Sequence, residues 1–98
     1  MAQDNPQSNQ ATVTVVLAAA LLRLFPGCQG RLEIAAGDVA GLLDELEARW
    51  PGMRDRLRDS TPRIRRHISI FVDGRRSHLE TPLTPGATVY VLTAISGG

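Results

Sequence analysis

Few side chains in this sequence of 98 residues could take part in covalent chemistry. There is one cysteine, Cys28, and there are two histidines, His67 and His78. One cysteine excludes an internal disulfide framework, and the three residues lack the spacing of a catalytic triad or a one-chain zinc site. All eleven basic residues are arginines, so the chain has neither a Schiff-base lysine nor a side-chain acceptor for an isopeptide bond. We expect no metal site, and we expect Cys28 to be an ordinary loop side chain.

The two glycines that close the sequence, Gly97 and Gly98, are the second place where chemistry is possible. Glycine lacks Cβ, so the pair can pass through a narrow channel and adopt backbone angles closed to other residues. The stretch Thr93–Gly98 can extend up to about 20 Å beyond the last expected strand. We expect Ile95, Ser96 and Gly97 to thread into the active site of a partner. The alternative is an ordinary frayed chain end.

The length and composition fit one small domain between two terminal segments. The hydrophobic content is 43% and the formal net charge is +1, which is not the bulk charge of a dedicated nucleic-acid binder. Residues 1–11 are polar and aperiodic, which predicts a disordered leader, followed by a domain over 12–93 and a flexible tail over 94–98. The apolar run Ala11–Leu22 has no basic residue before it and is too short to span a bilayer. We therefore expect a cytoplasmic protein without a membrane segment.

Alternating patterns predict two strands in the first half of the domain. These are Thr12–Leu17 and Arg31–Ile34. The apolar residues of the first strand fall on one face, Val13, Val15 and Leu17. Because Phe25-Pro26-Gly27 interrupts the pattern between the strands, we expect a hairpin with a long connecting loop.

The main helix is the best-defined element of the sequence. Asp38 predicts its start, because a carboxylate there can accept hydrogen bonds from the amides of the first turn. Pro51-Gly52 predicts its end. Apolar residues lie between them at helical spacing, Val39, Leu42, Leu43, Leu46 and Trp50. Asp44, Glu45 and Glu47 fall off this stripe, so we expect them on the solvated face.

The second half of the domain contains a strong strand, Ile68–Val72, followed by the hairpin signal Asp73-Gly74. A short strand is expected around Ser77–Leu79, and the last strand is Thr88–Leu92. One short helical turn is expected around Arg54–Arg58. One helix and several alternating strands predict a two-layer α+β domain, with a sheet of four to five strands packed on one main helix.

The side-chain alternation also predicts an apolar patch on the outer face of the sheet. If the aliphatic residues of the strands face the helix, the patch consists of Val16, Phe71, Tyr90 and Leu92. Such patches usually mark partner sites, so we expect a partner to dock here. The alternative is that the loop Pro51–Arg66 folds over these residues as a second small core.

The element order together with the terminal glycines resembles the ubiquitin-like β-grasp sulfur carriers of the MoaD and ThiS type. The resemblance covers about Thr12 to Gly98. It is carried by the stretches Asp38–Leu43, Ile68–Gly74 and Pro82–Val91, and by the tail Ala94–Gly98. The long basic loop Pro51–Arg66 is more similar to the carriers of cysteine synthesis than to the short thiamine carriers.

The resemblance implies a carrier that is not itself an enzyme. An adenylyltransferase of the ubiquitin-activating type would use ATP to activate Gly98, and a sulfur donor would then convert it to a thiocarboxylate. The sulfur would pass to a synthase that makes molybdopterin, thiamine, cysteine or a specialised metabolite. The chain itself would bind no cofactor.

Two other functions remain open alongside the carrier. The chain could be a ubiquitin-like modifier whose activated Gly98 forms an amide with a lysine of another protein. It could also be an interaction module with an incidental glycine pair. The arginines of the loop Arg54–Arg66 could form a basic surface for phosphate or an acidic partner, or a solvated loop. The loop has no interleaved aromatic residue, so we do not expect nucleic acid as a partner.

Overall fold

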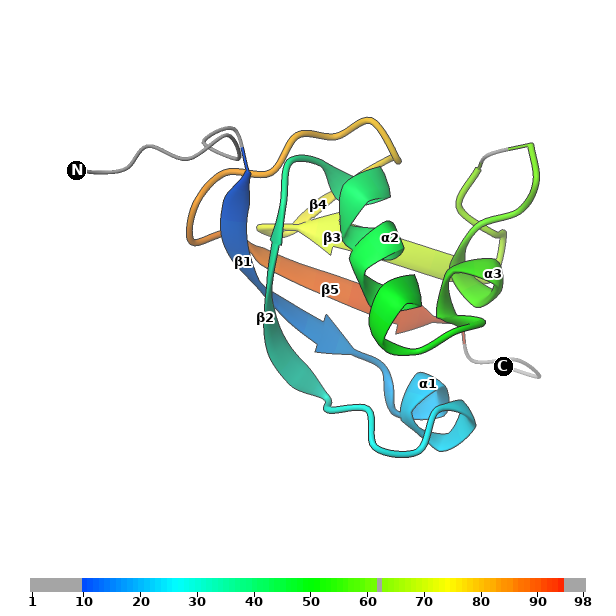
Figure 1. The fold of residues 1–98 in the computed structure, drawn as a ribbon. Helices are drawn as coiled ribbons and strands as arrows, with labels where there is room; N and C mark the ends of the chain where they lie inside the picture. Colours follow the sequence, from blue (N-terminus) through cyan, green and yellow to red (C-terminus); the bar gives the residue numbers. More distant parts are fainter. Residues whose placement is uncertain (1–9, 62, 95–98) are drawn as a thin grey trace.

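The computed structural model describes residues 10–61 and 63–94 of the chain. It contains one five-stranded mixed sheet, with α2 and α3 on one face (Figure 1), which confirms the α+β class. The strand order is β2-β1-β5-β3-β4, so the last strand of the chain lies at the centre of the sheet. The elements in chain order are β1 (Ala11–Leu17), α1 (Ala19–Leu24), β2 (Arg31–Ala36), α2 (Val39–Arg49), α3 (Met53–Leu57), β3 (Ile68–Val72), β4 (Arg75–Arg76) and β5 (Thr88–Thr93). Among the described residues, no helix is long and apolar enough to cross a membrane.

The first hairpin, β1 and β2, buries one face as its alternation predicts. Val13 pairs with Ile34, and all the alternate residues of β1 from Ala11 to Leu17 are buried. The connection between the strands is not the expected long loop, because Ala19–Leu24 forms the short helix α1 and places Leu21 in the core. A helix of six residues is too short to show a helical period, so it could not be distinguished from the apolar strand before it.

The helix α2 begins and ends where its sequence signals predict. Asp38 caps it, since the N–H of Gly41 donates to Oδ1 of Asp38 at 2.8 Å. The backbone segment after β4 completes the cap, because the N–H groups of Val39 and Ala40 donate to backbone carbonyls of that segment. Four residues of the helix are fully buried against the sheet, Val39, Leu42, Leu43 and Leu46.

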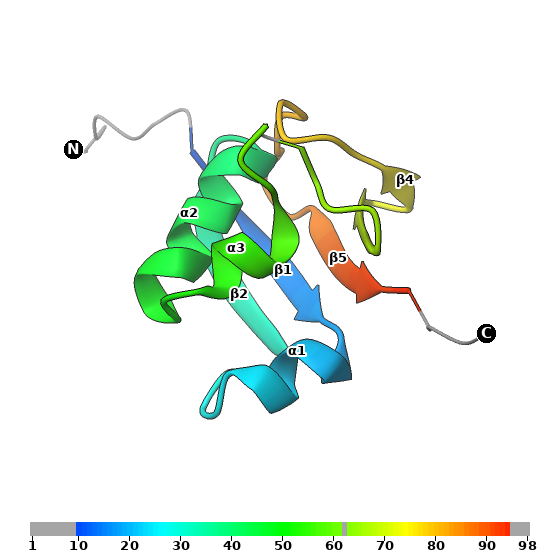
Figure 2. The same ribbon diagram turned by 90° about the vertical axis from the view of Figure 1, so that its right-hand side faces the viewer.

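The loop Pro51–Arg66 packs on the same side of the sheet as α2. It begins with α3, whose residues Met53 and Leu57 are fully buried in the main core next to α2 (Figure 2). The alternative that this loop covers the outer face of the sheet is therefore wrong. The physical reason is that Met53 and Leu57, four residues apart on α3, form an apolar face that is buried in the core beside α2.

The second hairpin joins β3 to β4 through Asp73 and Gly74, both with positive φ (50° and 85°). This is the geometry of a tight two-residue turn, and it pairs Val72 directly with Arg75. The short strand is therefore Arg75–Arg76, and the expectation of a strand around Ser77–Leu79 is wrong. A two-residue turn leaves no unpaired residues before the returning strand, so pairing begins at once after Gly74.

The strand β5 joins the two hairpins into one sheet. It runs parallel to β1 and antiparallel to β3. Its inward residues, Val89 and Val91, are fully buried under α2 and α3, whereas Tyr90 and Leu92 face the opposite side. This alternation gives the sheet one covered face and one open face, which we call the open face below.

Candidate functional site

The four residues of the expected docking patch lie together on the open face. Val16 pairs with Tyr90 across β1 and β5, and Phe71 pairs with Tyr90 across β3 and β5. Residues paired on neighbouring strands point to the same side, so Val16, Tyr90 and Phe71 form one row across three strands. Leu92 lies on the same face, two residues beyond Tyr90. Tyr90 and Leu92 are each 39% exposed, and Val16 and Phe71 are half-buried.

An arginine lies at each end of this apolar row. Arg31 of β2 pairs with Val16, and Arg76 of β4 pairs with Phe71. The guanidinium carbon of Arg76 lies 5.6 Å from the centre of the Phe71 ring, and its Nη2 donates to Oγ of Ser69 at 3.2 Å. The row therefore presents apolar contact area between two positive charges. Neither arginine was expected beside the patch from the sequence, although the two-residue turn after Val72 places Arg76 opposite Phe71.

The strand that carries the patch leads directly to the end of the chain. Thr93 pairs with Ile68, and the N–H of Ala94 donates to the carbonyl of His67 at 2.7 Å. The chain is thus held to the sheet as far as Ala94, two residues after Leu92. The expected threading and reacting residues, Ile95, Ser96, Gly97 and Gly98, lie outside the described residues.

Cys28 has the environment of a structural thiol. It is half-buried beside the core, and burial raises the pKa of its thiol, which keeps the sulfur protonated. The side chains of His67 and His78 are exposed. In residues 10–61 and 63–94, no three side chains of the metal-binding kinds gather into one group.

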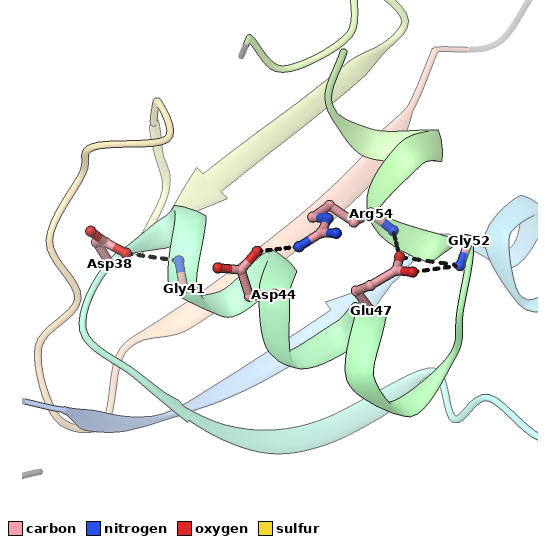
Figure 3. A network of polar contacts seen from close by, with 6 residues as sticks. All are labelled: Asp38, Gly41, Asp44, Glu47, Gly52 and Arg54. Carbon is pink, nitrogen blue, oxygen red and sulfur yellow. Dashed lines mark hydrogen bonds and ion pairs between the residues drawn. The ribbon is translucent and has the colours of Figure 1, made fainter. Parts of the chain in front are cut away.

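Two acids of α2 fix the start of the arginine-rich loop (Figure 3). The Glu47 carboxylate accepts hydrogen bonds from the N–H groups of Gly52 (3.1 Å) and Arg54 (3.0 Å), and these bonds lower the pKa of Glu47. Asp44 accepts from Nη1 of Arg54 at 2.7 Å in an exposed ion pair. The expectation that Glu47 and Asp44 belong to a purely solvated face therefore misses their contacts with α3.

A third acid, Asp59, shapes the middle of the same loop. Its Oδ1 accepts from the hydroxyl and the N–H of Thr61 and from the N–H of Arg63, and these bonds lower the pKa of Asp59. Nε of Arg65 donates to the carbonyl of Asp55 at 2.6 Å. The loop is therefore held in one shape while the side chains of Arg63 and Arg66 stay exposed.

The family model described as the ThiS family matches residues 16–98, which is most of the sequence. The chain belongs to the ThiS family. The resemblance to sulfur carriers of the MoaD and ThiS type is thereby confirmed. No curated protein matches this ThiS-family chain.

Solved structures show the same fold for this ThiS-family chain. One is a chain in the crystal structure of the Amycolatopsis orientalis BexX/CysO complex, 28% identical, with 88% of this chain and 99% of that chain covered and a TM-score of 0.76. Another is Mycobacterium tuberculosis CysO, 25% identical, with coverages of 85% and 99% and a TM-score of 0.75. A third is the small archaeal modifier protein 1 of Methanosarcina acetivorans, 25% identical, with coverages of 91% and 98% and a TM-score of 0.73. The ubiquitin-like β-grasp fold is confirmed.

Proposed function

We propose that this ThiS-family chain is a sulfur carrier that is adenylated and then thiocarboxylated at Gly98. The observation that carries the proposal is the family match, which extends over residues 16–98 and so includes most of the β-grasp domain together with Gly97 and Gly98. The central strand β5, held between β1 and β3, supports it by giving the chain end a rigid base.

The reaction has to make a poor acyl donor reactive. A carboxylate oxygen of Gly98 would attack the α-phosphorus of ATP and release pyrophosphate, forming an acyl adenylate. Sulfide would then attack the carbonyl carbon and expel AMP, leaving a thiocarboxylate and one proton. No electron is gained or lost in either step when sulfide is the donor.

The chain in this scheme is a substrate, and its partners supply the catalysis. We propose that an adenylyltransferase of the ubiquitin-activating type binds ATP and performs both activation steps in the cytoplasm. This carrier binds no cofactor of its own. The second partner is a synthase that accepts the sulfur.

The open face is the proposed docking surface for the adenylyltransferase. Tyr90 and Leu92 offer exposed apolar area, and Leu92 precedes Gly98 by six residues in the sequence, so the end of the chain is long enough to reach into a partner seated on them. Arg31 and Arg76 at the two ends of the row favour a partner with an apolar centre and acidic groups at its rim.

Likeness to a chain of the BexX/CysO complex favours a carrier that forms a complex with a partner protein, and we propose that this partner is the sulfur-accepting synthase. Among the pathways that the resemblance implies, we favour one that uses a CysO-like carrier, either cysteine synthesis or a specialised metabolite, over molybdopterin or thiamine. The two CysO-containing structures and the long loop Pro51–Arg66 support this choice.

A modifier function is the second candidate, because a small archaeal modifier protein also shares the fold at 25% identity. In that case the activated Gly98 would form an amide with a lysine of another protein. An interaction module with an incidental glycine pair is the third possibility.

Intact mass spectrometry tests the proposal. The full chain is incubated with a cognate adenylyltransferase, ATP and sulfide, beside a chain lacking Gly98 and a chain lacking residues 1–9. We expect the mass gain of an oxygen-to-sulfur exchange on the full chain and on the chain lacking residues 1–9, and none without Gly98. No adduct from an enzyme that forms adenylate with its own carrier would contradict the proposal.

An immunoblot of cells that express a tagged chain separates the first two functions. A modifier gives conjugates of higher mass that disappear when Gly98 is deleted. A dedicated carrier gives only the free chain. If the Gly98 deletion changes neither sulfur transfer nor conjugates, the interaction module is favoured.

A further inference from the structure

The strand β2 forms an uncovered edge of the sheet (Figure 1). It is the outermost strand, and among the described residues it pairs with β1 alone. The opposite edge is covered by the chain itself, because β4, the carbonyl of Arg65 and the N–H of Ser77 bond to β3 there. The edge of β2 is therefore the place where the sheet can accept another strand.

The pairing with β1 determines which backbone groups of β2 point outward. The N–H of Leu17 donates to the carbonyl of Gly30 at 2.9 Å, so these two residues form a hydrogen-bonded pair. Such pairs alternate in an antiparallel ladder, so every second residue after Gly30, beginning with Leu32, bonds to β1. The residues between them direct their N–H and C=O groups to the free edge, and these are Arg31, Glu33 and Ala35. All three are exposed, and their outward groups have no hydrogen-bond partner in the part of the chain that the structure describes.

Two side chains of opposite charge lie on this edge. Arg31 and Glu33 are two residues apart on β2, so both point to the open face, and both are exposed. Neither forms an ion pair within residues 10–61 and 63–94. A strand added at this edge therefore meets a positive and a negative charge at alternate positions.

A second copy of β2 supplies the matching charges. If two β2 strands run antiparallel with Leu32 opposite Leu32, Arg31 of each copy lies opposite Glu33 of the other. A shift of two residues in either direction would place Arg31 opposite Arg31 or Glu33 opposite Glu33, and like charges directly opposite each other destabilise a strand pair. A shift of one residue would put the open face of one copy on the same side as the covered face of the other. The two charges therefore favour a single register.

The same register satisfies the backbone of the edge. Arg31 and Glu33 carry outward groups, so each Arg31–Glu33 pair can exchange two hydrogen bonds, and two-fold symmetry gives two such pairs. Ala35 would lie opposite Gln29 of the other copy, where its small side chain leaves room for the approaching strand. On the covered face, Leu32, which is 7% exposed, would meet its counterpart at the symmetry axis.

We propose that two copies of this chain associate through β2 in this register, so that their two five-stranded sheets join into one. We call this assembly the β2 dimer. The formal net charge of +1 leaves little repulsion between the copies. Because β1 separates β5 from the β2 edge, the dimer leaves Tyr90 and Leu92 uncovered and uses only Arg31 from the border of the open face. The inference goes beyond the proposed function and does not rest on it.

Sedimentation velocity and amide hydrogen exchange of the full chain test the β2 dimer. We expect a reversible monomer–dimer equilibrium with a Kd of roughly 10 µM to 1 mM, because an interface made by one short strand from each copy is small. The Arg31 and Glu33 amides should exchange more slowly as the dimer fraction rises, by about tenfold where nine-tenths of the chain is dimeric, because they exchange only from the monomer. A dimer formed through the open face would leave these two amides unprotected.

Charge-reversed variants with a matched control test the register. Arg31→Glu is expected to weaken association about tenfold or more, because symmetry repeats the substitution and each repeat replaces attraction by repulsion. Combining Arg31→Glu with Glu33→Arg exchanges the two charges and should restore the Kd to within about threefold of the parent value. Arg75→Glu makes the same change in net charge on an exposed residue of β4, at the opposite edge, and should change the Kd less than about twofold.

Three outcomes would overturn the inference. One is a chain that stays monomeric up to about 1 mM, since the proposed Kd would make a dimer visible at that concentration. A second is a dimer that the charge-exchanged variant forms no better than Arg31→Glu does. The third is protection of the Arg31 and Glu33 amides that does not depend on concentration, which would show that the chain itself occupies the edge.

Discussion

The side chain of Glu47 positions a helix other than its own. It belongs to α2, yet its carboxylate binds the backbone of Gly52 and Arg54 at the start of α3. An amphipathic pattern identifies Glu47 only as a residue off the apolar stripe. Whether such an acid meets water or another backbone depends on the turn that follows, and here Gly52 has a φ of +97° that turns the chain back toward it.

Glu47→Gln is expected to lower the stability of the domain at pH 7. The folded state lowers the pKa of Glu47, so the carboxylate stabilises the fold above its unfolded pKa of about 4.3. That stabilisation is lost as the pH falls through the folded value. The difference in urea midpoint between the two proteins should therefore shrink as the pH is lowered from 7 toward 3.

Glu45→Gln is the control, because it removes a carboxylate from the same helix without touching α3. Its midpoint should stay close to that of the parent chain at both pH values. A deficit of Glu47→Gln that is independent of pH would show that the variant acts by something other than the carboxylate charge.

At the scale of elements, the sequence predicted best where a long period or a specific turn signal exists. The helix from Asp38 to Trp50 and the strand Ile68–Val72 match the prediction because each has a clear period and a clear stop. The helix α1 was missed because six residues carry no period, and β4 was misplaced because the expected position ignored the length of the turn at Asp73-Gly74. A local sequence pattern predicts that a helix or strand exists. Strand pairing and packing against other elements determine the residues at which it begins and ends.

The helix α3 is expected to be an integral part of the core, although it contains five residues. Leu57→Ala should cost about 2–5 kcal/mol of unfolding free energy, because the leucine is fully buried and its removal leaves a cavity. Urea unfolding measures this cost. Leu24→Ala on α1, where the side chain is 49% exposed, should stay within about 0.5 kcal/mol of the parent. Equal small losses for both variants would mean that α3 is detached in solution.

At the scale of the whole molecule, the open face could be predicted from side-chain alternation alone, whereas its charged border also required the register of the two hairpins. The alternation of β3 and β5 was enough to place Phe71, Tyr90 and Leu92 on one side. Arg31 and Arg76 joined them only once the registers of two hairpins were known, and register is a property of the assembled sheet. The proposed chemistry at Gly98 rests on the family resemblance and on the terminal glycines.

Tyr90→Ala should impair docking and leave the fold intact. Under the proposed function, it is expected to raise the KM for the carrier in the adenylation reaction about tenfold or more, with little change in kcat, because the side chain contacts the partner and not the reacting atoms. Pyrophosphate release measures both constants. Thr12→Ala, on an exposed residue at the far end of β1, is the matched control. An unchanged KM for Tyr90→Ala would place the adenylyltransferase on another surface.

The central position of β5 has a mechanical consequence. A partner that draws in the chain end applies tension along β5, whose ladders run to β1 on one side and β3 on the other. Such a load acts along the strand, so it shears two rows of hydrogen bonds at once. A strand at the edge of a sheet that is pulled across its axis would instead lose its hydrogen bonds one at a time. We therefore expect the domain to resist a pull at its end better than a domain whose last strand lies at the edge of the sheet.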